Sequence, residues 1–197
     1  MPHATTRNAH VRAGHLSSRF DVILIASESP RTLMEGFTPG TVPPRYEGGL
    51  GAEGARALDA FVRAGGTLVC LNQCAAFAIE QLRLPVKDTL RGLPRREFFM
   101  NGSIVEVAAD TSHPVMAGMP GRAKVFVDRS PAFKTLEGFE GSVLARYQEA
   151  GSPLLSGYLL GERHLNGMAA ELDVAHRDGH VLLIGFRPQW RGQPVGT

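Results

Sequence analysis

The stretch GGTLVCLNQCAA, residues 65–76, combines two glycines, an apolar run and a cysteine followed by small residues. The run TLVCL predicts a buried strand, and Cys74 follows the turn that ends it. A strand, a sharp turn and a helix N-terminus are also the parts that present a catalytic nucleophile. Such a turn favours glycine two residues before and two after the nucleophile, but Asn72 and Ala76 occupy these places here. Cys74 is therefore a candidate nucleophile, and a small buried thiol is the alternative.

The segments before this stretch predict a strand and a crossover helix. DVILIAS, residues 21–27, is typical of a strand buried on both faces. AEGARALDAFVRAG, residues 52–65, places its apolar residues on one face of a helix. With TLVCL, these segments predict a right-handed parallel strand pair. The Pro- and Gly-rich loop between them, residues 28–51, is too long for a simple connector, and we expect it to cover a site or a partner surface.

From Phe98 onward the pattern predicts mainly strands. Short apolar segments alternate with turns, and residues 167–186 predict a hairpin whose turn is Asp178-Gly179. The sequence therefore predicts one α/β domain over residues 20–197 with a β-rich second half. Residues 1–19 are predicted to be a disordered or poorly ordered leader.

Composition and charge exclude several classes of partner and site. The 21 basic residues nearly balance the 19 acidic ones, and the apolar runs are only strand-length, so we expect neither nucleic acid nor a membrane as partner. The leader has no apolar core typical of a secretory signal, and the compartment stays unknown. On an extended chain Cys70 and Cys74 would lie roughly 13 Å apart, too far for a disulfide. No C-x-x-C zinc pattern occurs, so neither a metal nor a cofactor is expected.

Three segments, in order, resemble class I glutamine amidotransferases. FDVILIASESP (residues 20–30) lies where that family has its first strand and oxyanion loop. GTLVCLNQCAA lies at the nucleophile elbow, and VLLIGFRPQ (residues 181–189) lies where the family has F-H-P-E. The resemblance implies a flavodoxin-like, mostly parallel sheet with flanking helices.

The same resemblance implies that the glutaminase site is degenerate. The oxyanion loop would be Ser27, Glu28 and Ser29, without glycine and with a carboxylate that opposes a developing oxyanion. Arg187 and Gln189 replace the family's His and Glu. Arginine stays protonated and cannot act as a base, and glutamine carries no charge to stabilise an imidazolium.

The histidines do not replace the missing base. His113, in SHPVMAGMP, is predicted to shape a loop, and His164 is predicted to be a loop residue. His176 is expected to lie in the solvated turn of the hairpin.

Over residues 20–197 the chain also resembles the C-terminal amidotransferase-like domain of bacterial zinc carboxypeptidases. Segments that carry this resemblance include LPRREFF, TSHPVMAGMP and GFRPQWRGQPVGT. Such enzymes bind zinc in a separate domain through an H-x-x-E pair, which this sequence lacks. The resemblance implies an accessory domain, truncated at both ends, whose partner is the peptidase domain of a parent polypeptide, secreted or periplasmic.

The leading hypothesis is thus a non-catalytic domain that packs against another domain or binds a peptide or glycan. The alternative is an active thiol hydrolase that uses Cys74. A stand-alone small-ligand binder is a third possibility, although GGLGAEG does not match the phosphate-binding G-x-G-x-x-G pattern.

Overall fold

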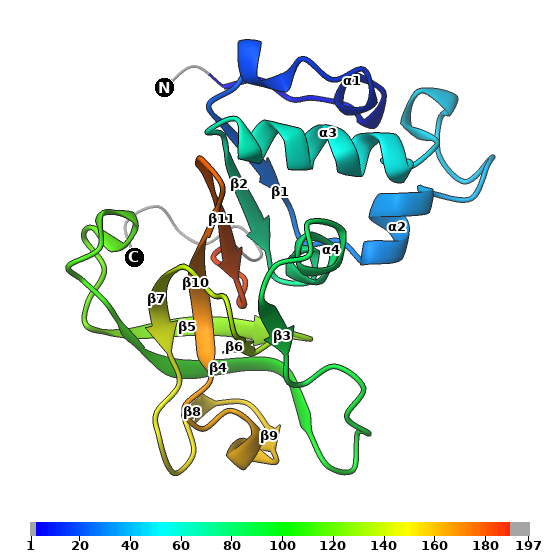
Figure 1. Cartoon of the computed structure of the whole chain (residues 1–197). Helices are drawn as coiled ribbons and strands as arrows, with labels where there is room; N and C mark the ends of the chain where they lie inside the picture. The colour runs from blue at the N-terminus through cyan, green and yellow to red at the C-terminus, as the bar shows by residue number, and fades with distance from the viewer. Residues whose placement is uncertain (1–2, 190–197) are drawn as a thin grey trace.

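The computed structural model describes residues 3–189, which form one curled sheet with a few helices beside it (Figure 1). The helices α1 to α4 span Asn8–Arg12, Pro30–Glu35, Gly51–Arg63 and Cys74–Gln81. The 3₁₀ helices η1 to η4 span Leu16–Ser18, Pro44–Tyr46, Pro114–Met116 and Glu162–His164. Strands β1 to β6 span Val22–Ile25, Thr67–Leu71, Val86–Asp88, Phe99–Ala109, Arg122–Asp128 and Phe133–Thr135. Strands β7 to β11 span Gly141–Arg146, Leu154–Ser156, Leu159–Leu160, Ala169–His176 and Gly179–Ile184.

The main path of the sheet has the strand order β1-β2-β11-β10-β7-β4-β5. Only β1 with β2 and β2 with β11 are parallel pairs. Every other pairing in the described sheet is antiparallel, including those of the short strands β3, β6, β8 and β9. The sheet is therefore mixed, mostly antiparallel, and curls into a half-barrel.

The predicted fold class, a mostly parallel flavodoxin-like sheet with flanking helices as in class I glutamine amidotransferases, is wrong. Parallel neighbours need long crossover connections, usually helices, whereas antiparallel neighbours need only turns. After α4 the described chain contains no α-helix, so its strands are joined by loops and 3₁₀ turns and pair antiparallel with one another. The helices gather beside the β1, β2 and β11 part of the sheet, and β4 and β5 run across the other part (Figure 1).

Strand β1 lies in the predicted place but not in the predicted environment. Among the described strands it pairs with β2 alone, and it forms an edge of the described sheet. Val22 and Leu24 point away from the helices and are 54% and 60% exposed. The prediction that residues 21–27 are buried on both faces is therefore wrong, because helices cover only one face here.

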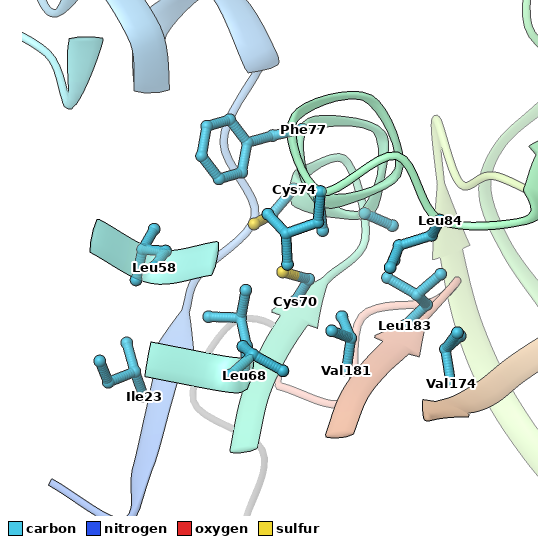
Figure 2. Packing of buried hydrophobic residues seen from close by; sticks show 14 of the residues in the cluster. Ile23, Leu58, Leu68, Cys70, Cys74, Phe77, Leu84, Val174, Val181 and Leu183 are labelled. Atoms are coloured by element: carbon cyan, nitrogen blue, oxygen red, sulfur yellow. The ribbon is translucent and has the colours of Figure 1, made fainter. Parts of the chain in front are cut away.

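The core consists of two apolar clusters on opposite faces of the central strands. The first packs α3 and α4 against β1, β2 and β11, with Leu58, Phe61 and Phe77 among its largest members (Figure 2). The second lies inside the curl and contains Val69 and Leu182 from the reverse face of β2 and β11. Because residues 68 and 70 face one cluster and residue 69 the other, β2 links both parts of the core.

The chain between β1 and α3 folds back on itself instead of crossing as a loose loop. Helix α2 begins at Pro30 and is capped by Ser29, whose Oγ accepts from Thr32 N at 3.0 Å. Gly49 then passes so close to α2 that a Cβ there would lie 2.1 Å from Met34 O. Only glycine fits this crossing.

Part of the predicted leader packs on α3. Val11 of α1 and Leu16 of η1 are buried members of the first cluster. Asn8 Nδ2 donates to Gly48 O at 2.9 Å, which connects α1 to the end of the segment before α3.

Candidate functional site

Asn72 is the centre of a buried polar network at the carboxyl ends of β2 and β11. Its backbone is left-handed (φ 50°), a conformation that Asn tolerates better than most residues. Its N–H donates to Ile184 O at 2.7 Å, and its Nδ2 donates to Asp128 O at 3.1 Å and Ser27 Oγ at 3.3 Å. Ser130 Oγ donates to Asn72 Oδ1 at 2.7 Å. Asn72, two residues before Cys74, therefore links the ends of β1, β2, β5 and β11 through its hydrogen bonds.

Arg187 lies in the same region, where its charge forms an ion pair within the protein. Its Nη2 lies 3.2 Å from Asp128 Oδ2, and its backbone N–H donates to Phe126 O at 2.9 Å. Both charged side chains are only 12% exposed. Such a buried pair is costly to break from one side, because the remaining charge is left without compensation. Arg187 thus connects the end of β11 to β5.

Cys74 is the first residue of α4, and its side chain lies in the apolar core beside Cys70 (Figure 2). A side-chain hydrogen bond with Cys70 and burial together raise the pKa of the Cys74 thiol well above its usual range. The sharp turn at Asn72 brings the two thiols together, so the expected separation of roughly 13 Å for an extended chain is wrong. Both cysteines are free thiols.

The other predicted positions are only partly brought together. Ser27 joins the network through Asn72. Glu28 Oε1 accepts from Ser29 N at 2.7 Å, so Glu28 and Ser29 are used to start α2. Gln189 is exposed.

A cleft of about 1130 Å³ opens beside this network, between the start of α4 and the β4–β5 pair. Gln73 and Ala76 form its wall on the α4 side, above the buried thiols. The remaining lining residues are Pro30, Asp88, Leu90, Arg91, Arg95, Phe98, Phe99, Met100, Asn101, Gly102, Phe126, Asp128, Arg129, Ser130 and Pro131. The cleft therefore combines apolar rings with charged and amide groups, as ligand sites usually do.

Sequence reasoning missed most of this cleft. The segment LPRREFF was noted only as part of a resemblance, yet it supplies Arg95, Phe98 and Phe99. In this segment, two arginines close to two phenylalanines are the sequence feature that could have indicated a binding surface. The neighbouring part of the lining comes from residues 126–131 at the end of β5, which pairs with β4, and no local pattern connects them to this segment.

The two carboxylates that line the cleft, Asp88 and Asp128, already have partners within the protein. Asp128 pairs with Arg187. Asp88 Oδ1 accepts from Leu90 N at 3.0 Å, and burial raises the pKa of Asp88 despite its backbone hydrogen bonds. Glu80, outside the lining, pairs with Arg91.

No described histidine lines the cleft, although the His164 ring lies edge-on to Phe98 with 6.2 Å between the ring centres. His113 Nδ1 accepts from Val115 N at 3.3 Å and caps η3, and its Nε2 lies 3.6 Å from Asp173 Oδ2. His176 Nε2 lies 2.7 Å from Asp59 Oδ1 of α3, and its side chain is only 14% exposed. The prediction of a solvated turn at His176 is therefore wrong, because the hairpin packs against α3.

Within residues 3–189, no group of three or more His, Cys, Asp or Glu side chains is arranged to hold a metal ion. A search of the same residues finds no helix that is both long and apolar enough to cross a membrane.

No model of a protein family matches the sequence, and no curated protein matches it either. Solved structures do resemble the fold. A cytoplasmic protein of Salmonella typhimurium, STM3548, matches 97% of this chain and 68% of its own, at 14% identity and a TM-score of 0.51. A second cytoplasmic protein of Salmonella typhimurium LT2, STM1381, matches 97% of this chain and 68% of its own, at 13% identity and a TM-score of 0.50. A ThuA-like protein of Parabacteroides merdae matches 93% of this chain and 64% of its own, at 13% identity and a TM-score of 0.48.

At these identities the likeness extends to the fold alone. The comparisons give no support to the predicted resemblance to zinc carboxypeptidases, and the function proposed below does not depend on it.

Proposed function

We propose that this chain is a non-catalytic binding domain, and that the cleft between α4 and β4–β5 holds its ligand. The observation that carries the proposal is the position of Cys74. The thiol lies under the wall of the cleft instead of in it, next to a second thiol that disfavours the thiolate. A thiolate is the nucleophilic form of cysteine, so the arrangement opposes the alternative, a thiol hydrolase.

The groups that do reach the cleft are suited to binding. Phe98 and Phe99 offer apolar rings, and Asn101 and Gln73 offer amide groups. Ser130 Oγ donates to Asn72 Oδ1 and accepts from Asp128 N, and these buried hydrogen bonds fix the floor of the cleft. A rigid polar floor beside apolar walls fits a segment of a peptide or a glycan.

The test is backbone amide NMR of the whole chain with two probes, the dipeptide glycyl-phenylalanine and the disaccharide of N-acetylglucosamine. We expect at least one probe to shift the amides of residues 100–102 and 130, which line the cleft on the β4–β5 side. Ala76→Trp fills the cleft from α4 and should abolish these shifts. Gln81→Trp adds the same ring on an exposed position of α4 outside the cleft and should leave them unchanged.

Two results would contradict the proposal. One is that neither probe shifts these amides. The other is that a probe is hydrolysed at a rate that Cys74→Ala abolishes, which would restore the thiol hydrolase.

A further inference from the structure

We infer that the ligand of this cleft carries an oxyanion, a carboxylate or a phosphate, next to an apolar ring. This inference rests on the proposed binding function and adds the chemical class of the ligand. It is carried by two arginines at the cleft, Arg95 and Arg129, whose charges the described protein leaves largely uncompensated.

Arg95 stands over an aromatic ring instead of a carboxylate. Its guanidinium carbon lies 5.9 Å from the centre of the Phe99 ring. Among residues 3–189 it has no ion-pair partner, in contrast to Arg91, which pairs with Glu80. The Phe99 ring itself contacts Tyr158, with 6.0 Å between the ring centres. Arg95 is thus placed over an aromatic surface with its N–H groups available.

Arg129, which follows β5, lines the cleft in a conformation that costs energy. Its φ is 50°, a left-handed value that is uncommon for a side chain of this size. Its only described carboxylate neighbour is Asp128, at 4.0 Å, and Arg187 approaches that carboxylate more closely, at 3.2 Å. The Arg129 side chain is 71% exposed. Strained residues of this kind concentrate at ligand sites.

The balance of charge around the cleft favours an anion. Counting the lining residues and their ion-pair partners, four arginines face three carboxylates: Arg91, Arg95, Arg129 and Arg187 against Glu80, Asp88 and Asp128. Two of these carboxylates are engaged by Arg91 and Arg187, and Asp88 turns one oxygen to a backbone N–H. Guanidinium groups bind carboxylate and phosphate through paired N–H donors. The phenylalanines beside them would pack against a ring attached to that anion.

The experiment compares three small probes that share a phenyl ring: phenylacetate, phenyl phosphate and the neutral phenylacetamide. Binding to the whole chain is measured by amide shifts at low salt. We expect at least one anion to bind about tenfold more tightly than the amide, because hydrogen bonds to charged groups are the stronger ones. Arg95→Gln and Arg129→Gln should each weaken that anion about three- to tenfold and leave phenylacetamide unchanged.

Arg96→Gln is the matched control, since Arg96 is exposed, follows Arg95 and does not line the cleft. A response of phenylacetate alone identifies a carboxylate ligand, and a response of phenyl phosphate alone identifies a phosphate. Melting curves of the variants confirm that folding is unchanged, as expected for exposed side chains.

The two proposals fail in different ways. If the three probes bind equally and the arginine variants have no effect, the anion inference is wrong and the cleft still binds. If the phenyl probes do not bind but glycyl-phenylalanine or the disaccharide shifts the cleft amides, the anion inference alone is wrong. If no probe of either experiment binds, or if Ala76→Trp leaves binding unchanged, the cleft is not the site and both proposals are wrong.

Discussion

At the scale of single residues, the local sequence identified Cys74 as the position of interest but not its environment. The decisive residue is Asn72, which turns the chain so sharply that the two thiols meet in the core. Its side-chain partners, Ser27, Asp128 and Ser130, lie far away in the sequence. A pattern of neighbouring residues cannot reveal partners that only the folded chain brings together.

Cys74 should react slowly in the folded protein. With 0% relative exposure and a raised pKa, little thiolate is present and little reagent can reach it. We expect alkylation by iodoacetamide at pH 7.5 to be about a hundredfold slower than in guanidinium-unfolded protein, because reaction requires local opening. Mass spectrometry against time measures both rates. A native rate equal to that of free cysteine would show that the thiol is accessible.

Glu171 should make stability depend on pH. Burial raises its pKa from 4.5 to about 7, so the folded chain holds a proton there that the unfolded chain has released. Stability should therefore fall as the pH rises from about 4.5 through about 7, by at most about 3 kcal/mol. In Glu171→Gln this component of the loss should disappear. Urea unfolding at pH 5 and pH 8 measures the free energy of unfolding of both proteins. If it changes equally with pH in the two, Glu171 is not the group responsible.

At the scale of elements, the sequence predicted where strands and turns lie along the chain better than it predicted what packs around them. The strand TLVCL is β2, with the predicted bounds, because its apolar run and Gly65-Gly66 mark both ends. The hairpin of β10 and β11 is present, but its turn is Arg177-Asp178, one residue earlier than predicted. Gly179 is needed instead as the first residue of β11, where a Cβ would lie 2.1 Å from Val62 O. A glycine required by packing was thus interpreted as one required by a turn.

Replacing Arg177 by glycine should stabilise the hairpin. Arg177 has a φ of 60°, which costs energy for arginine and little for glycine. We expect Arg177→Gly to raise the free energy of unfolding by about 0.5 kcal/mol, since the relief of strain exceeds the added freedom of the unfolded chain. Asp178→Gly, at the neighbouring turn residue without positive φ, should lower it. Urea unfolding distinguishes the two, and stabilisation by both variants alike would contradict the explanation.

At the scale of the whole molecule, the first half of the chain misled the prediction of fold class. Its parallel pair, β1 and β2, is real, and the resemblance to class I glutamine amidotransferases added the expectation of a mostly parallel sheet. The second half has no α-helix among its described residues, and this difference decides the architecture. The cleft was equally hidden, because Gln73, Arg95 and Arg129 meet only after the sheet has curled.

The uncovered edge at β1 should make the molecule associate at high concentration. An exposed apolar edge strand without charge or proline offers its backbone to another chain. We expect sedimentation velocity to show concentration-dependent association that Leu24→Lys suppresses. Val115→Lys, which adds the same charge at an exposed site far from the edge in the sequence, should have no such effect. A wild-type chain that stays monomeric at millimolar concentration would contradict this.

The place of β2 in the sheet sets an order of events during synthesis. Leu68 pairs with Ile23 on one side and with Val181 on the other, so one neighbour of β2 leaves the ribosome before β2 and the other long after it. Until residue 184 has emerged, β2 has an open side, and both apolar clusters lack the residues that β11 supplies. The nascent chain must therefore carry unburied apolar surface while all the residues between β2 and β11 are synthesised, a condition in which chaperones engage a growing polypeptide.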